Sequence, residues 1–352
     1  MGINGIVDLR SDTVTHPTPR MREAMYRAEV GDDVFGEDPT VRRLEEMAAE
    51  RMGKEAGLFV VSGTMGNLIS LLVQCGRGEE VILGDRSHIF LYECAAPSAL
   101  GGISLRPVPN LPDGTMDLEE VEAAVRPDNV HFPRTRLIAL ENTHNRCGGV
   151  VLPPEYFRRV RELADRCGLQ VHLDGARMFN AAIVLRVDVR EFTRYVDSVT
   201  FCLSKGLCAP VGSVVCGSEE FIREARRARK ALGGGMRQAG VLAAAGIVAL
   251  EEMVDRLAED HRRAKMLAEG IVEIPGYTVD LSQVQTNMVY FDLSEGTRED
   301  RLEVVGRLRE RGVLIGAYPD AGFRAVTHYW IDDRDVGRAL EALARAVISP
   351  KE

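Results

Sequence analysis

Short apolar runs and amphipathic stretches alternate along the first two thirds of the chain. The apolar runs, bounded by polar residues or glycine, predict buried strands over 57–61, 79–85, 102–108, 136–142, 169–175, 197–204 and 211–217. Apolar positions at helical spacing predict helices over 62–75, 118–125, 154–168 and 219–232. This alternation predicts an α/β fold, in which helices cover both faces of a mainly parallel sheet.

The pattern changes near the end of the chain. A long helical stretch is predicted from about Gln238 to Glu269. Shorter strand patterns (277–281, 287–293, 313–317, 323–330) and helical patterns (297–312, 333–348) follow it. We therefore expect two domains. Residues 1–255 are predicted to form an N-terminal arm and a large α/β domain, and residues 256–352 a small C-terminal α+β domain.

Composition narrows the classes of partner and compartment. The net charge of −9 disfavours a nucleic-acid partner. The first residues lack the pattern of a secretory signal, and the apolar run 239–250 is too short to span a bilayer, so no membrane partner is expected. Seven cysteines without a CxxC pair disfavour both a disulfide framework and a zinc site. These features favour a cytoplasmic protein with free thiols.

Lys205 is the only charged residue between Asp197 and Glu219. An ammonium group in apolar surroundings loses hydration, which lowers the pKa of a lysine and makes its free amine available for chemistry. The alternative is a lysine whose charged end reaches water at the end of a strand. Taken alone, Lys205 does not decide between the two.

Two more polar features follow predicted strands at the same edge of the sheet. Residues Ser62-Gly63-Thr64 open a helix, where backbone N–H groups can cradle a phosphate, although Ser62 can equally be a helix cap. Asp174 ends the strand before that of Lys205, and it can hold a protonated ring nitrogen or pair with Arg177. Together with Lys205, these groups match the three parts of pyridoxal phosphate, with Lys205 as the Schiff-base residue.

The histidines offer candidate bases. His88 follows a predicted strand and could stack on a flat ring or accept a proton. His131 lies in a loop before a strand, and His144, His172 and His328 have contexts that suit packed side chains. From its own context, each histidine is more often structural than catalytic.

Nine stretches of the chain, taken together, resemble the L-threonine aldolases, which are pyridoxal-phosphate enzymes with the aspartate-aminotransferase fold (fold type I). These stretches are DLRSDTVTHPT (8–18), VGDDVFGEDPTV (30–41), SGTMGN (62–67), DRSHIF (85–90), ENTHN (141–145), HLDGAR (172–177), SKGLCAPVGS (204–213), GGGMRQAG (233–240) and FRAVTH (323–328). They extend over nearly the whole chain in the family's order, so the joint match is specific.

The resemblance implies roles for individual residues. It implies cofactor contacts from Ser62, Gly63, Thr64, His88, Asp174, Arg177, Ser204, Lys205, Lys230 and Arg237, with Lys205 as the Schiff-base residue. It implies that Ser11, His131, Arg177 and Arg324 bind the substrate, and that Lys205, His88, His131 and Asp174 take part in catalysis. Arg237, with Lys230 near it, matches a residue that reaches the cofactor phosphate of a neighbouring subunit, so a homotetramer with shared active sites is expected.

The implied activity is retro-aldol cleavage of L-threonine, L-allo-threonine and related β-hydroxy-α-amino acids to glycine and an aldehyde. The protein would thus be a carbon–carbon lyase with a small amino acid as its substrate. β-Elimination or transamination on the same cofactor is the alternative reaction, and a relative that binds without turnover is a third possibility. Elimination yields ammonia and a keto acid, whereas an aldolase yields glycine and an aldehyde.

The chain departs from the family pattern at three positions. Cys208 stands where relatives often have glycine, so we expect that the backbone there does not need a conformation open only to glycine. Phe35 and Phe179 stand where tyrosine and tryptophan are often found, which could adjust the pocket without altering the chemistry.

Overall fold

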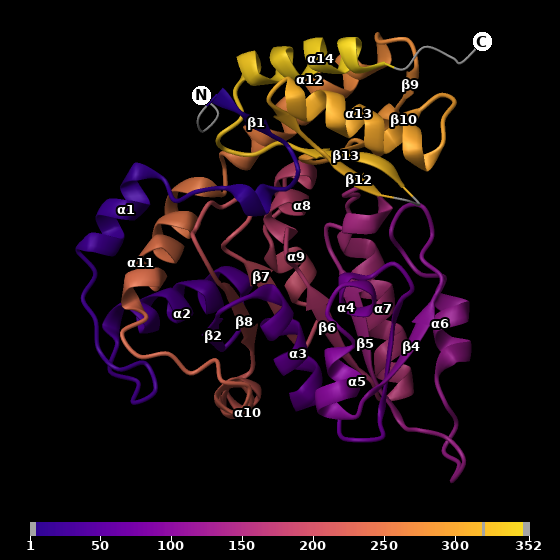
Figure 1. Ribbon diagram of the computed structural model, residues 1–352. Helices are drawn as coiled ribbons and strands as arrows, with labels where there is room; N and C mark the ends of the chain where they lie inside the picture. The colour runs from indigo at the N-terminus through magenta and orange to yellow at the C-terminus, as the bar shows by residue number, and fades with distance from the viewer. Residues whose placement is uncertain (1–4, 319–320, 348–352) are drawn as a thin grey trace.

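The computed structural model describes residues 5–318 and 321–347, and it contains a large and a small sheet (Figure 1). In the described chain the large sheet has seven strands in the order β2-β8-β7-β6-β5-β3-β4. These strands are β2 (Ala56–Val60), β3 (Glu80–Gly84), β4 (Ser104–Val108), β5 (Thr135–Glu141), β6 (Gln170–Asp174), β7 (Ser198–Cys202) and β8 (Ser213–Gly217). Each of the seven predicted strands is confirmed.

Most neighbours in this sheet are parallel. β4, β3, β5, β6 and β7 pair in parallel, whereas β8 lies antiparallel between β7 and β2. Since β8 opposes both of its neighbours, β2 runs in the same direction as β7. The carboxyl ends of the six co-directional strands therefore meet at one edge, and the predicted mainly parallel α/β fold is confirmed.

Helices cover both faces of the sheet because the side chains of a strand alternate between its faces. On β2, Phe59 packs into a large core with Leu44 of α2, whereas Leu58 and Val60 pack with Ile69 of α3 on the other face. The helices of this unit are α1 (Pro19–Tyr26), α2 (Pro39–Met52), α3 (Gly63–Gln74), α4 (His88–Leu91), α5 (Ala96–Gly101), α6 (Leu118–Ala124), α7 (Pro154–Cys167), α8 (Met178–Leu185), α9 (Arg190–Thr193), α10 (Glu219–Ala231) and α11 (Gly240–Val248).

A second hydrophobic core lies beside the first. In the described residues it contains an antiparallel sheet in the order β12-β13-β10-β9 and a parallel pair, β1 with β11. These strands are β1 (Val7–Asp8), β9 (Tyr277–Thr278), β10 (Met288–Leu293), β11 (Val313–Leu314), β12 (Gly316–Tyr318) and β13 (Gly322–Val326). Helices α12 (Leu257–Val272), α13 (Arg298–Glu310) and α14 (Asp333–Ala346) pack on them.

The N-terminal segment crosses between the two cores. Val7 and Leu9 are buried in the second core, although the other residues of that core come from the C-terminal part of the sequence. The segment then forms the short helix η2 (Asp12–Val14) and leads to α1. The division of the chain at residues 255 and 256 into two domains stays a prediction.

The helical stretch predicted from Gln238 to Glu269 is not continuous. It consists of α11, a π-helical turn η4 (Ala249–Met253), a turn, and α12. Leu250 is buried in the first core and Leu267 in the second. The interruption lets the chain pass from one core to the other, which one straight helix would not do. Two further 3₁₀ turns are η3 (Asn145–Cys147) and η5 (Leu281–Gln283).

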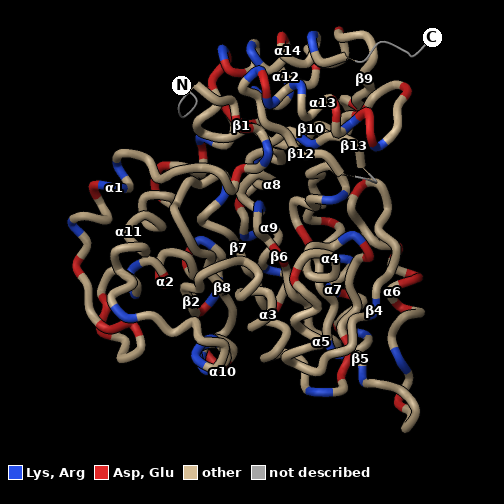
Figure 2. Tube along the Cα trace, in the orientation of Figure 1, with Lys and Arg blue, Asp and Glu red and all other residues tan. Residues whose placement is uncertain are grey.

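Charged residues of both signs are interspersed along the trace (Figure 2). The basic run on α10 illustrates this, since Arg226 pairs with Glu45 and Arg229 with Asp33. Among the described residues, no helix is long and apolar enough to cross a membrane. All seven cysteines lie in the described part of the chain and are free.

The backbone at Cys208 is in a region that favours glycine without requiring it. Cys208 is fully buried and has a φ of 64°. A residue with a Cβ enters this left-handed region at a cost of about 1–2 kcal/mol. The expectation that glycine is not obligatory therefore stands, but the position is strained.

We predict that the Cys208→Gly variant is more stable than Cys208→Ala by about 1 kcal/mol, because only glycine relieves the strain of the left-handed conformation. Both variants lose the same sulfur, so their difference isolates the Cβ. Urea unfolding at one protein concentration measures it. An alanine variant as stable as the glycine variant would show that the strain is negligible.

Candidate active site

A cavity of about 230 Å³ opens where the carboxyl ends of the strands face the second core. Its lining comes from both units and from the N-terminal segment: Ser11, Thr13, His88, Tyr92, Asn145, Arg177, Lys205, Tyr318 and Arg324. Five of these residues are among those that the sequence singled out, namely Ser11, His88, Arg177, Lys205 and Arg324. The fold thus brings them together from positions more than three hundred residues apart.

Lys205 lies in the loop that follows β7. It lines the main cavity and a small void of about 10 Å³ beside Arg177 and Leu257. Its carbonyl oxygen accepts hydrogen bonds from Thr15 Oγ1 (3.0 Å) and from the backbone N–H of Cys208 (2.9 Å). The main chain of Lys205 is therefore fixed by the N-terminal segment, while the residue lines the cavity. Ser204, which precedes it, is half-buried.

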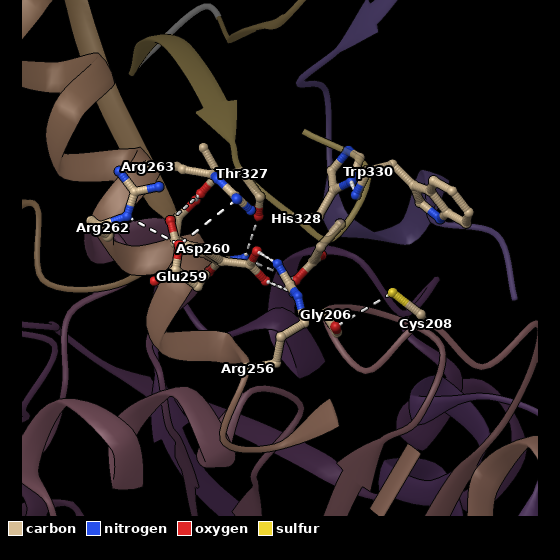
Figure 3. A network of polar contacts seen from close by, with 12 residues as sticks. Gly206, Cys208, Arg256, Glu259, Asp260, Arg262, Arg263, Thr327, His328 and Trp330 are labelled. Atoms are coloured by element: carbon tan, nitrogen blue, oxygen red, sulfur yellow. Dashed lines mark hydrogen bonds and ion pairs between the residues drawn. The ribbon is translucent and has the colours of Figure 1, made fainter. Parts of the chain in front are cut away.

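Polar contacts around this loop also involve the second unit (Figure 3). Arg256 forms a bidentate ion pair with the buried carboxylate of Asp260, and Thr327 Oγ1 donates to the carbonyl of Asp260 at 2.6 Å. Cys208 Sγ lies 3.6 Å from the carbonyl of Gly206, in the loop that carries Lys205. The Thr327 contact joins α12 to the residue after β13, and the Cys208 contact lies within the loop itself.

Asp174 is buried at the end of β6. Its Oδ2 accepts from Asn67 Nδ2 (2.8 Å) and its Oδ1 from the backbone N–H of Ala176 (3.1 Å). The neighbouring His172 is fully buried, and burial lowers its pKa to about 4, so it is neutral and bonds to Asn67 and Ser198. The alternative pairing of Asp174 with Arg177 does not occur in the structure.

Arg177 pairs instead with Asp12 of the N-terminal segment. Its Nε and Nη2 donate to the two carboxylate oxygens at 2.8 and 2.6 Å, and both side chains are buried. Burial alone would raise the pKa of Asp12, but the Arg177 guanidinium overrides this effect and holds the pKa well below its usual range. Sequence reasoning missed Asp12; its signal was an acidic residue inside the DLRSDT stretch.

Arg324 presents an incompletely paired guanidinium. It comes from β13, is mostly buried, and donates to Asn145 Oδ1 (2.9 Å) and to the carbonyl of Arg10 (3.0 Å). Its Nε is buried without a hydrogen-bond partner in the structure. Tyr318 lies below the guanidinium, with its ring centre 5.1 Å from Cζ. A partly paired guanidinium that lines a cavity suits a carboxylate ligand.

The N-terminus of α3 offers backbone donors at the end of β2. Ser62 Oγ accepts from the N–H of Met65, so its side chain caps the helix. The N–H groups of Gly63 and Thr64 begin the helix and have no acceptor within it. A Cβ at Gly63 would lie 2.9 Å from Cys202 Sγ, so a larger residue would require a shift of the neighbouring side chain. The arrangement suits a phosphate at a helix N-terminus.

His88 is held at two points. Its backbone N–H donates to Glu141 Oε2 (2.7 Å), and its Nδ1 lies 2.8 Å from Glu93 Oε1. Glu93 was missed by sequence reasoning; it is a buried acid five residues after His88. The ligand atoms of His88, Glu93 and Asp174 lie within 4.8 Å of one another.

Five residues implied by the resemblance follow or end β2, β6 and β7 without lining the cavity: Ser62, Gly63, Thr64, Asp174 and Ser204. Three others lie elsewhere in the single chain. His131 is exposed in the loop before β5. Lys230 lines a separate hollow beside Val34 and Gly235, and Arg237 is exposed and paired with Asp32 at 3.1 Å.

The donor set fits pyridoxal phosphate, judged by the chemistry of each group. A buried carboxylate, a lysine side chain and a helix N-terminus follow or end β6, β7 and β2, which share one edge of the sheet. These are the groups that the ring nitrogen, the aldehyde and the phosphate of this cofactor require.

Comparisons with known proteins point to one enzyme family. Residues 8–294 match the family model described as "Beta-eliminating lyase". The chain is 52% identical to "Low-specificity L-threonine aldolase 1" of Arabidopsis thaliana, over 98% of each chain. It is 46% identical to the "Low specificity L-threonine aldolase" of Escherichia coli K12, over 92% of this chain and 94% of that one. Leishmania major threonine aldolase superposes with a TM-score of 0.81 at 20% identity, covering 97% and 100% of the two chains.

We predict that Asp12→Asn destabilises the protein by about 3–5 kcal/mol, because Arg177 is left buried with its charge uncompensated. Asp12 has a lowered pKa in the folded state, so its contribution is present above the pKa of an unfolded carboxyl group and is lost as the pH falls. The loss of stability in the variant should therefore shrink towards low pH.

Urea unfolding at several pH values measures this effect. Asp333→Asn is the matched control, since Asp333 forms exposed ion pairs with Arg262 and Arg263 and should change stability little. Equal losses in the two variants would contradict a special role for the buried pair.

Proposed function

The chain belongs to the beta-eliminating lyase family, and from this premise we propose that it is a pyridoxal-phosphate-dependent threonine aldolase. It cleaves L-threonine, L-allo-threonine and related β-hydroxy-α-amino acids to glycine and an aldehyde. The observation that carries the proposal is that Lys205 and Arg324 line one cavity, while Asp174 ends the strand beside that of Lys205, in a chain 52% identical to a low-specificity L-threonine aldolase.

Four groups would hold the cofactor. Lys205 would bind it through its amine, Asp174 would pair with the ring nitrogen, and the N–H groups of Gly63 and Thr64 would bind the phosphate. When bound, pyridoxal phosphate supplies an electron-accepting ring that stabilises negative charge on the substrate Cα. The buried state of Asp174 and its two hydrogen bonds keep its carboxylate in a fixed position.

Arg324 would bind the substrate carboxylate. The Asn145 and Arg10 contacts fix the guanidinium before substrate arrives, so little entropy is lost when the carboxylate binds. Ser11 lines the same cavity and can add a hydroxyl donor. Fixing the carboxylate sets the rotation of the substrate, and therefore which bond to Cα is broken.

A base must take the proton of the β-hydroxyl as the Cα–Cβ bond breaks. His88 lines the cavity, whereas His131 is exposed on a loop outside it in the single chain. His88 is therefore the base that the geometry of one chain supports, and His131 is left with a role only through a neighbouring subunit.

The remaining proposals concern assembly and location. We propose a homotetramer with shared active sites, because Arg237 and Lys230 lie outside the cavity of their own chain. Free cysteines support a cytoplasmic location. The substrate is a small amino acid, and neither nucleic acid nor membrane is proposed as a partner.

We predict that Lys205→Ala lowers turnover by roughly 10³-fold or more, because no other amine in the cavity lining can replace it. Acetaldehyde release from L-threonine and from L-allo-threonine measures the activity, and circular dichroism checks the fold. Wild-type turnover in this variant would refute the assignment. Ammonia and a keto acid from the unaltered protein would instead indicate elimination.

A second prediction tests the shared sites. Lys205→Ala and Arg237→Ala should each be nearly inactive alone, but co-expressed subunits should recover activity in about a quarter of the sites. In a mixed dimer, one site combines an intact Lys205 with an intact Arg237 from the other subunit. Activity of the mixture no higher than that of the separate variants would show that Arg237 does not serve a neighbouring site.

A further inference from the structure

We propose that Glu93 is a positioning residue that makes His88 the base of the reaction. The inference rests on the proposed aldolase function and goes beyond it, since it assigns a role to Glu93 and explains how His88 is prepared to act as the base. Glu93 does not line the cavity and acts through His88.

The first argument is geometry. The Glu93 side chain is fully buried, whereas that of His88 is 32% exposed and lines the cavity. Nδ1 of His88 and Oε1 of Glu93 are 2.8 Å apart, and the backbone of His88 is separately tied to Glu141. Two anchors therefore fix the orientation of the imidazole ring, and Nε2 is the nitrogen left for a ligand.

The second argument concerns the position of the proton. Oε1 of Glu93 also accepts from Asn67 Nδ2 at 2.9 Å, and the same amide group donates to Asp174. Oε2 of Glu93 is buried without a hydrogen-bond partner in the structure. Any proton on Glu93 would thus sit on Oε2, so Oε1 is an acceptor in either state. His88 then carries its proton on Nδ1, and Nε2 has the free lone pair of a base.

The charges around His88 support an imidazolium once it forms. The negative charge near the ring comes from Glu93, Glu141 and Asp174. The ring centres of His88 and Tyr92 are 5.5 Å apart. The cavity lining also contains three cationic residues, Lys205, Arg177 and Arg324. Burial lowers the pKa of His88, but the hydrogen bond to Glu93 and the three acidic charges outweigh burial and raise it. Burial and the nearby Asp174 in turn raise the pKa of Glu93.

The proton balance of the step follows from this arrangement. The hydroxyl proton of the substrate moves to Nε2 of His88, and the O–H electron pair forms the C=O bond of the aldehyde. The Cα–Cβ bond breaks and leaves its electron pair on Cα, which takes up one proton to give glycine. Glu93 keeps its hydrogen bond to Nδ1 throughout and stabilises the positive charge on the ring, as a carboxylate does behind other catalytic histidines.

The test compares Glu93→Gln with the unaltered protein. We expect kcat/KM for L-threonine to fall about 10–100-fold, with KM changed less, because the charge behind the base is lost. The acid limb of the pH profile should move to lower pH, since removing Glu93 removes a cause of the raised pKa of His88. Glu93→Asp keeps the charge and should recover part of the rate.

Three controls separate positioning from a structural effect. Glu80→Gln removes a buried carboxylate at the opposite end of β3 and should leave the rate and pH profile unchanged. Added to His88→Asn, the Glu93→Gln change should have little further effect, because both act in one step. In the cofactor-free protein, modification of His88 by diethylpyrocarbonate, followed by peptide mass spectrometry, should persist to lower pH in Glu93→Gln.

The outcomes distinguish the two proposals. An unaltered protein that releases no aldehyde would refute the aldolase function itself. An active protein in which Glu93→Gln leaves the rate and the pH profile unchanged would refute the role of Glu93. Losses that add fully to those of His88→Asn would also refute it, because they would show that Glu93 acts independently of His88.

Discussion

The buried ion pair between Asp12 and Arg177 is the interaction on which the site depends. Both charges are out of water, and neither has another partner of opposite charge at hydrogen-bond distance among the described residues. The pair ties the N-terminal segment to the loop after β6. From there Thr15 holds the carbonyl of Lys205, and the carbonyl of Arg10 holds Arg324. One segment thus places two of the groups that the reaction needs.

The second constraint is the common direction of most strands in the large sheet. Because six strands run in one direction, their loops meet at one edge, and that edge faces the second core. The lysine, the aspartate and the helix N-terminus therefore converge without being close in sequence. The opposite edge carries Glu80 at the start of β3, which forms ion pairs with Arg106 and Arg126. The position of the site follows from strand direction.

Most elements could be predicted from hydrophobic periodicity, since burial on one or both faces leaves a regular pattern. Residues 238–269 are the exception, because apolar positions continue at helical spacing while the helix passes from one core to another. Periodicity reports that a face is buried and does not report which core buries it. For the same reason, the contribution of β1 to the second core could not be inferred.

The sequence by itself determined the inventory of chemistry: a lone lysine, an acid ending a neighbouring strand, a glycine at a helix start and an arginine near the end of the chain. Only the tertiary structure decided the pairings. Arg177 bonds to Asp12 rather than to the nearby Asp174, and Glu93 lies behind His88. The physical reason is that the partner of a buried charge is set by distance in space, and packing brings together residues that are far apart along the chain.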